Sequence, residues 1–383
     1  MSVHTVHVGE CAQVINGFAF KSNLFTTERR GLPIVRIRDV IRGRSETYYT
    51  GEYPSSAVLQ NGDLLIGMDG EFNMAPWQGG RALLNQRVCK IEALSGKSDI
   101  SYLRYALLVV LKRIEDRTPF VTVKHLSSEE LREESIPLPG LPEQKRIARL
   151  LEQADRLRIT RRYALELSGA VLPDVFLELF ASMSTQCVPT VGELAADKPG
   201  AIRTGPFGSQ LLHSEFTASG IAVLGIDNAV NNRFEWSERR FISARKYQEL
   251  GRYTVFPGDV IITIMGTCGR CAIVPDNIPT AINTKHLCCI TLDRERCHPV
   301  YLHGAFLYHP FVRRQLGVAT KGAIMDGLNM GIIEGLRIPI PPLSAQKQFA
   351  TLTAQYERLR ARQREALRQA DHLFQSLLDR AFR

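Results

Sequence analysis

Two similar stretches of this 383-residue chain decide its architecture. Residues 136–158 read IPLPGLPEQKRIARLLEQADRLR, and residues 338–360 read IPIPPLSAQKQFATLTAQYERLR. When the alignment is extended without gaps to Phe180 and Phe382, the two copies are identical at 16 of 45 positions. Self-similarity at a fixed offset is the sequence signature of a repeat architecture, so we predict a duplicated unit.

Each copy begins with prolines and continues as a long helix. Proline fixes φ and restricts the residue before it, so the first residues of each copy are expected to be extended. Pro142 suits the first position of a helix, and Ser344 suits a helix cap. We predict a helix of about 38 residues, roughly 57 Å long, in each copy.

Apolar residues in both helices recur at steps of three and four, which is the spacing of a coiled-coil seam. The seam is interrupted at Arg161 and shifts phase near Leu165, so imperfect pairing is expected there. We predict that the helices pack against each other as an antiparallel spine; a pair of ordinary core helices is the alternative. The predicted spine and partner-binding residues are Ile147, Leu150, Ala154, Leu157, Phe349, Leu352, Tyr356, Leu359, Ala366 and Ala370.

The repeat extends into the segments before the helices. Residues 61–66 and 257–262 each combine a turn, an aspartate and a short buried strand. Residues 84–88 also resemble residues 282–286. We therefore predict a mixed α/β chain of the α+β class with pseudo-two-fold symmetry. Its predicted parts are a domain at 1–135, a helical spacer at 136–184, a second domain at 185–337 and a second spacer at 338–383.

Composition places the chain among ordinary globular proteins. Hydrophobic residues make up 44% and charged residues 23%, which excludes a disordered or fibrous chain. The longest apolar run, Ala106 to Leu111, is far short of the ~20 residues of a membrane-spanning helix. The first residues do not read as a secretory signal, so we expect a cytoplasmic protein without a membrane partner, whose eight cysteines are thiols. The net charge of +9 favours a polyanionic partner.

With these features the chain resembles the specificity subunit of type I restriction-modification systems. The resemblance rests on the IPxPxLxxQK motif before each long helix and on three stretches that resemble target-recognition patterns, at residues 69–89, 205–209 and 266–274. It implies two target-recognition domains, at 1–135 and 185–337, separated by two conserved helical regions. Each domain would face one half of a split DNA target, with the spine setting their separation.

The resemblance also implies partners and places catalysis in them. These are double-stranded DNA, two methyltransferase subunits that methylate adenine with S-adenosylmethionine, and in some systems two restriction subunits that use ATP and Mg²⁺. This chain itself carries no recognisable phosphate-binding loop, amino-methyltransferase motif or hydrolase elbow. We therefore expect no catalytic residue and no cofactor in this chain.

The cysteines of the second half allow a metal reading. Cys268 and Cys271 have one half of a zinc-ribbon spacing, but the second pair at that spacing is missing. Small buried cysteines in strands explain the same residues, and we predict no metal site.

Candidate DNA-binding residues are polar and lie near glycine-rich turns, where side chains and backbone amides can approach the duplex. Phe72, Trp77 and Phe207 are expected in the core. The candidates in the first domain are Lys21, Ser22, Arg36, Arg38, Asn73, Arg87, Lys124 and His125. Those in the second are Ser209, Gln210, Asn228, Arg270, Lys285, His286 and Lys321.

The second long helix is the more basic of the two, with eight Lys or Arg and four Asp or Glu between Ser344 and Arg383. It is expected to face phosphate or an acidic partner surface. Two other functions stay open: an adaptor whose helices bridge proteins without reading DNA, and a specificity arm of a related phage-defence methylase.

Overall fold

The computed structural model describes residues 4–117, 124–317 and 328–382. The chain divides into two compact units. Unit 1 comprises Met1–Tyr163 with Glu365–Arg383, and unit 2 comprises Ala164–Arg364. Among the described residues, no helix is both long enough and apolar enough to cross a bilayer.

The described residues of unit 1 form three small sheets. The four-stranded sheet has the order β2 (Ala12–Asn16), β10 (Val88–Ala93), β7 (Leu64–Gly67), β8 (Met74–Pro76) and is antiparallel. The five-stranded sheet has the order β3 (Phe25–Thr26), β5 (Tyr48–Tyr49), β4 (Leu32–Val35), β9 (Ala82–Leu84), β6 (Val58–Leu59), with β4 and β9 parallel. The third sheet pairs β1 (Thr5–His7) with β11 (Ser135–Pro137).

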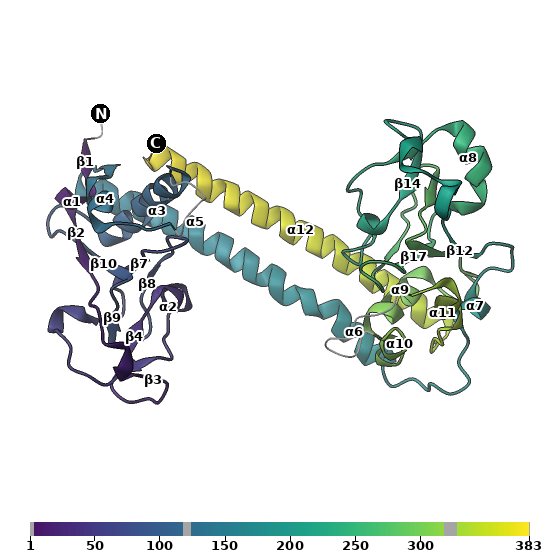
Figure 1. Ribbon diagram of the computed structural model, residues 1–383, viewed down its shortest axis with the longest axis horizontal. Helices are drawn as coiled ribbons and strands as arrows, with labels where there is room; N and C mark the ends of the chain where they lie inside the picture. Colours follow the sequence, from purple (N-terminus) through teal and green to yellow (C-terminus); the bar gives the residue numbers. More distant parts are fainter. Residues whose placement is uncertain (1–3, 118–123, 318–327, 383) are drawn as a thin grey trace. The chain divides into compact units, whose positions relative to one another are not determined.

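Helices cover the four-stranded sheet of unit 1 and complete its core. Figure 1 shows α3 and α4 close to the strands of this unit. Tyr102 and Leu107 of α3, Leu151 of α5 and Phe374 of α12 (Leu343–Phe382) join the main hydrophobic cluster. The helices of this unit are α1 (Val8–Cys11), α2 (Ile37–Arg42), α3 (Ile100–Arg117), α4 (Ser128–Glu133), most of α5 (Leu141–Leu167), the last part of α12, and the short 3-10 turns η1 (Ser22–Leu24) and η2 (Ser55–Ala57).

Unit 2 repeats both larger sheets in the same order. The four-stranded sheet is β12 (Ile202–Thr204), β20 (Leu287–Ile290), β17 (Val260–Thr263), β18 (Cys271–Ile273). The five-stranded sheet is β13 (Phe216–Thr217), β15 (Phe241–Ile242), β14 (Ile221–Leu224), β19 (Ala281–Asn283), β16 (Thr254–Val255), with β14 and β19 parallel.

The helical layer of unit 2 also follows that of unit 1. Its helices are α6 (Val171–Phe180), α7 (Val191–Leu194), α8 (Ala244–Leu250), α9 (Pro299–Tyr308), α10 (Pro310–Gln315), α11 (Met330–Gly335) and the first part of α12 (Leu343–Phe382). Its 3-10 turns are η3 (Ser168–Ala170), η4 (Gly208–Gln210), η5 (His213–Glu215), η6 (Ile226–Asn228) and η7 (Gly251–Tyr253). Aromatic packing holds this layer, since Phe176 contacts Phe349 with ring centroids 5.2 Å apart. The predicted fold class, with its duplication, is therefore confirmed.

The repeated motif before each long helix has one physical role in both units. Gln144 is fully buried, donates to the carbonyls of Lys97 (3.0 Å) and Pro139 (2.7 Å), and accepts from the Asp99 N–H (2.9 Å). A buried amide that makes all these bonds fixes the start of the helix against the preceding segment.

The second copy repeats this arrangement bond for bond. Gln346 donates to the carbonyls of Arg296 (3.1 Å) and Pro341 (2.9 Å) and accepts from the His298 N–H (2.8 Å). A tyrosine hydroxyl adds a bond to the proline-rich segment in each unit: Tyr102 donates to the Pro137 carbonyl and Tyr301 to that of Pro339. The glutamine that is identical in the two copies thus anchors the start of each long helix.

The two long helices differ in continuity. Helix α12 runs unbroken for 40 residues, whereas the first copy ends as α5 at Leu167 and continues through a 3-10 turn into α6. The prediction of a single helix of about 38 residues is therefore wrong for the first copy. The break falls just after Leu165, where the apolar pattern changes phase, and before Pro173, which suits the first turn of a new helix.

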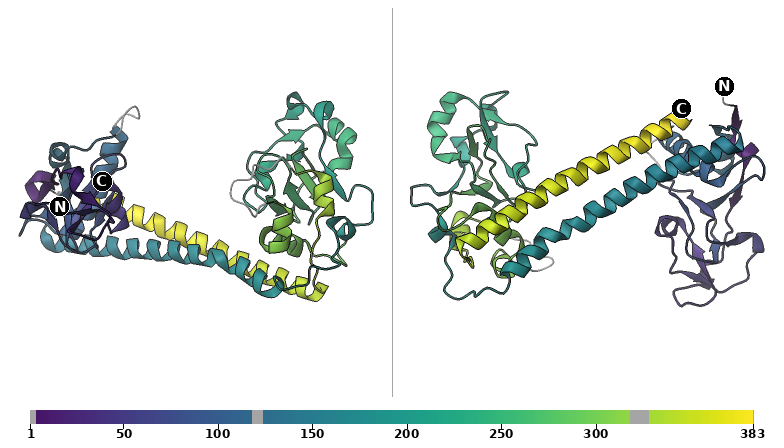
Figure 2. Two further views of the ribbon diagram at one scale, coloured as in Figure 1. Left: turned by 60° about the horizontal axis from the view of Figure 1, so that its bottom comes forward. Right: turned by 180° about the vertical axis from the view of Figure 1, so that it is seen from behind.

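Helices α5 and α12 lie side by side and antiparallel (Figures 1 and 2), as Arg162–Asp371 (3.5 Å) and Ser168–Gln363 (2.8 Å) show. The predicted seam is only partly correct. Ala154, Phe349 and Ala370 are buried, and Ile147, Tyr356 and Ala366 are half-buried. Leu150, Leu157, Leu352 and Leu359 are instead 40–51% exposed.

The buried face is displaced because each helix packs against its own unit as well as against its partner helix. In α5 the buried residues are Gln144, Ala148, Leu151, Ala154 and Asp155. In α12 Phe374 contacts Tyr105 of α3, with ring centroids 6.1 Å apart. A seam of period 3.5 assumes a single partner, and here there are two.

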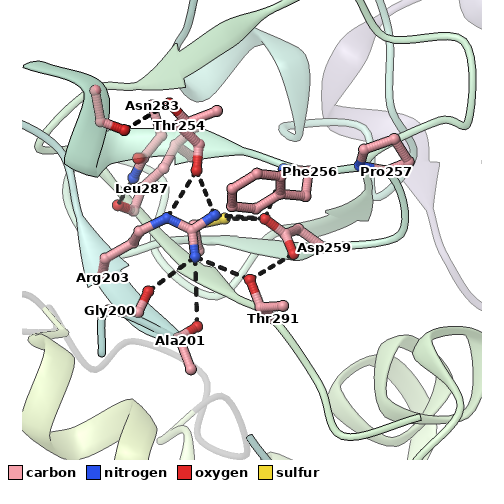
Figure 3. A network of polar contacts seen from close by, with 12 residues as sticks. Gly200, Ala201, Arg203, Thr254, Phe256, Pro257, Asp259, Asn283, Leu287 and Thr291 are labelled. Atoms are coloured by element: carbon pink, nitrogen blue, oxygen red, sulfur yellow. Dashed lines mark hydrogen bonds and ion pairs between the residues drawn. The ribbon is translucent and has the colours of Figure 1, made fainter. Parts of the chain in front are cut away.

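A buried ion pair holds the four-stranded sheet of unit 2 (Figure 3). Arg203 of β12 pairs with Asp259 at 2.6 Å, and both side chains are almost fully buried. The remaining guanidinium N–H groups donate to the carbonyls of Thr254 and Gly200 and to the Thr291 hydroxyl. Asp259 also accepts from the Phe256 N–H at 2.8 Å.

In unit 1 the equivalent cation is Lys90, which lies on the neighbouring strand of the corresponding pair. Arg203 faces Cys289 across the sheet, and the corresponding cross-strand pair in unit 1 is Ile15 and Lys90. There Lys90 lies 3.9 Å from Asp63, the aspartate that corresponds to Asp259. Each unit thus keeps one aspartate, buried in unit 2 and half-buried in unit 1, beside a cation that comes from the same cross-strand pair.

Candidate nucleic-acid interface

Four of the predicted DNA-binding residues meet at a shallow hollow of unit 1. They project from the ends of strands that the fold brings to one edge. Strands β4 and β9 are parallel, so Arg36 and Asn85 follow them at the same edge, and Arg87 precedes the antiparallel β10 beside Gly67 of β7. The hollow is lined by Arg36, Ile37, Arg38, Asp69, Glu71, Asn73, Asn85 and Arg87.

Carboxylates position two of the arginines in this hollow. Arg87 Nε lies 3.4 Å from Asp69 Oδ2, and Arg36 Nε lies 3.5 Å from Asp39 Oδ2. Arg38 is exposed on the first turn of α2. Guanidinium groups can donate to phosphate oxygens or to guanine, an asparagine amide suits adenine, and a carboxylate accepts from cytosine. The hollow therefore carries groups able to bind both the backbone and base edges.

The segment after the undescribed residues 118–123 adds two predicted residues to this edge. His125 Nδ1 lies 2.6 Å from Asp69 Oδ1, so Asp69 holds both His125 and Arg87. Lys124 donates to the Glu115 carbonyl at 2.7 Å, and its own carbonyl accepts from the Gly70 N–H. Lys21 and Ser22 are exposed at η1 and do not line the hollow.

The corresponding edge of unit 2 has a different charge pattern. Asp227 occupies the position of Arg38, and its partners are Arg240 and the Ser237 hydroxyl (2.5 Å). Lys285 and His286 are half-buried at this edge. Burial, with the nearby Lys285 and Arg240 charges, lowers the pKa of His286. The two edges are therefore equivalent in fold and distinct in chemistry.

The predicted residues of unit 2 are dispersed. Arg270 is exposed between β17 and β18, and Ser209 and Gln210 are exposed on η4. Gln210 accepts from the Tyr253 hydroxyl at 2.9 Å. Lys321 lies outside the described residues.

Asn228 has a structural position rather than an exposed one. It is 1% exposed, accepts from the Gly225 N–H at 2.9 Å and donates to the Glu235 carbonyl at 2.7 Å. Asp39 accepts in the same way from the Arg36 N–H in unit 1. The Asn228 and Asp39 side chains both cap the turn after the parallel strand of their unit. This buried capping position is inconsistent with placing Asn228 among the DNA contacts.

The structure also corrects the alignment of the strand ends by one residue. Val35 pairs with Leu84 in unit 1, and Leu224 pairs with Asn283 in unit 2. Leu84 therefore corresponds to Asn283 rather than to Ile282, and Arg87 corresponds to His286. A slip of one residue goes unnoticed in sequence because both segments carry asparagine, whereas in a sheet it would reverse the face of every side chain.

Two of the three aromatic residues that were expected in the core are buried. Trp77 and Phe72 are buried, as expected, whereas Phe207 is 50% exposed beside η4, so the expectation that Phe207 lies in the core was wrong.

All eight cysteines are free, and burial raises the pKa of Cys89, Cys288 and Cys297 to about 12. In the part of the chain that the structure describes, no three His, Cys, Asp or Glu side chains are grouped as metal ligands would be.

A second hollow, in unit 2, collects arginines that the sequence did not bring together. Arg233 and Arg270 come from loops, Arg313 from α10, and Arg360 and Arg364 from α12. Only Arg270 was among the predicted residues. For Arg360 and Arg364 the one earlier signal was the excess of basic residues in the second long helix, and Arg233 and Arg313 had no such signal.

Comparison with known proteins gives consistent matches. A family model described as the type I restriction modification DNA specificity domain matches residues 2–167 and 214–369. The type I restriction enzyme EcoBI specificity subunit of Escherichia coli is 29% identical, over 100% of this chain and 87% of the relative. The MjaVIII specificity subunit of Methanocaldococcus jannaschii is 22% identical, over 76% of this chain and 72% of the relative.

Two solved structures share the fold along almost the whole chain. The type I restriction-modification S subunit from M. genitalium superposes with a TM-score of 0.62 at 15% identity, covering 99% of this chain and 96% of that one. A chain from a structure of complex assembly and conformational transition of the type I R-M system gives 0.61 at 18% identity, covering 99% and 97%.

Proposed function

The chain belongs to the family of type I restriction-modification DNA specificity proteins and is a specificity subunit that recognises DNA, and on that premise we propose that each unit reads one half of a bipartite target. The observation that carries this proposal is the duplication. Each unit has a four-stranded and a five-stranded sheet in the same order and its own edge of polar strand ends. The adaptor hypothesis is not favoured, because the family is one of DNA specificity.

Different side chains on equivalent edges support two different half-sites. Arg38 of unit 1 is replaced by Asp227 in unit 2, and Arg87 by His286. Exchanging a donor for an acceptor at a base edge changes the preferred base. The two halves of the target are therefore expected to differ in sequence.

We further propose that the long helices dock two methyltransferase subunits, one on each unit. Four residues of α5 between Leu150 and Leu157 recur unchanged in α12 and are exposed in both helices. Exposed leucines flanked by polar groups are typical of protein interaction sites. This repeated stripe consists of Leu150, Gln153, Arg156 and Leu157 in unit 1 and of Leu352, Gln355, Arg358 and Leu359 in unit 2.

In this proposal the partners supply the chemistry. The methyltransferase would transfer a methyl group from S-adenosylmethionine to an adenine flipped out of the duplex. A restriction subunit, where the system has one, would use ATP and Mg²⁺. This chain would position the duplex and the partners.

The target proposal is tested by sequencing modified bases in DNA from cells that express this chain with its methyltransferase. A split motif with methylated adenines, absent from cells that lack the chain, is the expected result. Unchanged methylation with both proteins assembled would remove the specificity role.

The docking proposal is tested by the mass of the assembled complex. Leu150→Asp with Leu157→Asp is expected to reduce two methyltransferase subunits per chain to one, because only the stripe of unit 1 is altered. Leu167→Asp is the matched control, since Leu167 is 59% exposed on the same helix but corresponds to Gln369 in the second copy. Retention of both subunits by the double variant would contradict the proposal.

A further inference from the structure

The second hollow, in unit 2, has more cationic side chains than anionic partners for them. Arg233 pairs with Glu235, and Arg364 lies 3.9 Å from Glu357. Arg360 donates to neutral oxygens, the Leu165 carbonyl and the Ser168 hydroxyl (2.9 Å). We name this site, lined by Arg233, Arg270, Arg313, Arg360 and Arg364, the arginine hollow.

Three of these five guanidinium groups, those of Arg270, Arg313 and Arg360, have no carboxylate partner among the residues that the structure describes. Arginine is rarely left beside other arginines without an anion, because like charges at close range repel one another. The hollow has a volume of about 880 Å³, and Tyr308, Leu172 and Phe306 form its apolar side. There is thus space for an external anion within reach of several guanidinium groups.

Unit 1 provides an internal comparison. Its residues at the repeat positions of Arg360 and Arg364 are Arg158 and Arg162. Arg158 donates to Asp155 at 2.6 Å, and Arg162 lies 3.5 Å from Asp371. Both arginines are neutralised within the unit. Of these two repeat positions, only that of Arg360 therefore carries an unneutralised charge in unit 2, and this charge is not a consequence of the repeated helix.

The position of Arg270 indicates what kind of anion the hollow receives. Ile262 pairs with Cys271 in β17 and β18, as Ile66 pairs with Met74 in β7 and β8, so Arg270 occupies the place of Asn73. Asn73 lines the candidate recognition hollow of unit 1. The arginine hollow therefore adjoins the edge of unit 2 that corresponds to that surface, which favours DNA over an acidic segment of a partner protein.

We propose that the arginine hollow binds backbone phosphate of duplex DNA and anchors unit 2 without reading sequence. The proposal rests on the DNA-recognition function proposed above and adds a phosphate contact made jointly by α10, the recognition loops and the spine helix α12. Planar guanidinium groups match the oxygens of a phosphate in paired hydrogen bonds. Phosphate contacts of this kind set register and affinity, whereas base contacts set specificity.

The test measures DNA binding by the full chain in complex with its methyltransferase. Arg313→Gln is the first variant, because Arg313 is exposed on α10 and its side chain forms no ion pair with the residues that the structure describes. Arg245→Gln on α8 is the matched control, an exposed arginine outside the hollow. Affinity is measured for a cognate duplex and for one with a mismatched half-site, at several salt concentrations.

We expect Arg313→Gln to lower the affinity of the complex for both duplexes by the same factor, on the order of tenfold. The slope of log affinity against log salt is expected to fall by about 1, and Arg313→Lys to keep that slope while recovering part of the affinity. Arg245→Gln is expected to change neither quantity.

Three results would overturn the proposal. They are unchanged affinity and slope in Arg313→Gln, a loss confined to the cognate duplex, and a loss of methyltransferase from the complex with DNA affinity retained. The last would identify the hollow as a protein docking site. Failure of the proposed function itself is distinguishable, because the unaltered complex would then not prefer the cognate duplex.

Discussion

Moving a buried charge to the opposite strand tests how each unit stabilises its four-stranded sheet. Unit 2 has Arg203 facing Cys289, and unit 1 has isoleucine facing lysine at the same pair of positions. Arg203→Ile removes the cation from unit 2. Adding Cys289→Lys restores a cation beside Asp259 in the arrangement of unit 1.

The structure gives the expected size of the effect. Only 7% of the Arg203 side chain and 1% of that of Asp259 are exposed. Removing one member of a buried ion pair leaves an uncompensated charge and costs about 3–5 kcal/mol. We expect that loss for Arg203→Ile. The double variant is expected to recover about half of it, because a lysine ammonium replaces the charge but not the planar set of donors.

Each unit has one tryptophan, so their unfolding can be followed separately. Trp236 reports on unit 2, and the variant background Trp77→Phe removes the signal of unit 1. The measurement is urea denaturation of the full chain, monitored by fluorescence, with the free energy of unfolding taken from linear extrapolation. Arg245→Ile is the matched control and is expected to change stability by less than about 0.5 kcal/mol.

Two outcomes would refute this reasoning. A loss below about 1 kcal/mol in Arg203→Ile would place the pair in the range of surface ion pairs. A double variant no more stable than Arg203→Ile would show that the two units do not use equivalent cations.

Three further predictions concern the repeated framework, each measured by unfolding of unit 2. Gly205→Ala places a Cβ 2.0 Å from the Asn283 carbonyl oxygen and is expected to lower the free energy of unfolding by about 3 kcal/mol. In the control Gly251→Ala the new Cβ meets nothing within 4 Å, so stability should not change. Equal effects of the two substitutions would exclude steric crowding as the cause. Gln346→Leu removes a buried amide that bonds three backbone groups and is expected to cost about 3 kcal/mol; a neutral result would mean that water replaces the amide. Burial lowers the pKa of His303, so below about pH 6.5 the unfolded chain binds a proton that the folded unit does not. Stability is therefore expected to fall from about pH 7 to about pH 5, and to fall less in His303→Gln; an equal fall would assign the effect to other groups.

The sequence predicted what the repeat itself encodes. The duplicated domains, the extended proline-rich segments and the long helices all follow from local residue types at matching positions. Gln144 and Gln346 were visible as identical residues, and their buried hydrogen bonds explain that identity. The family resemblance rested on the same motif, and the family match confirms it.

What the sequence did not predict depends on packing between distant segments. The exposed leucines of the stripe have the same spacing as a buried seam, because helix periodicity marks an apolar face without identifying what covers it. The arginine hollow combines residues 233 to 364, which only the folded unit brings together. Asn228 has a side-chain type that suits DNA, and its burial as a cap becomes evident only once the turn after β14 is known.

Helix α12 determines the order in which the two units can complete their hydrophobic cores during translation. The ribosome makes residues 1–163 before unit 2, but Phe374, Leu378 and Phe382 of the hydrophobic core of unit 1 emerge after it. The amino-terminal unit therefore completes its core only after the whole of unit 2 has been translated. A premature stop codon after Arg364 would leave unit 2 with all its residues and expose apolar surface in the domain made first. A mutation in the codons of α12 after Arg364 thus has its structural effect in unit 1, most of which is translated before unit 2.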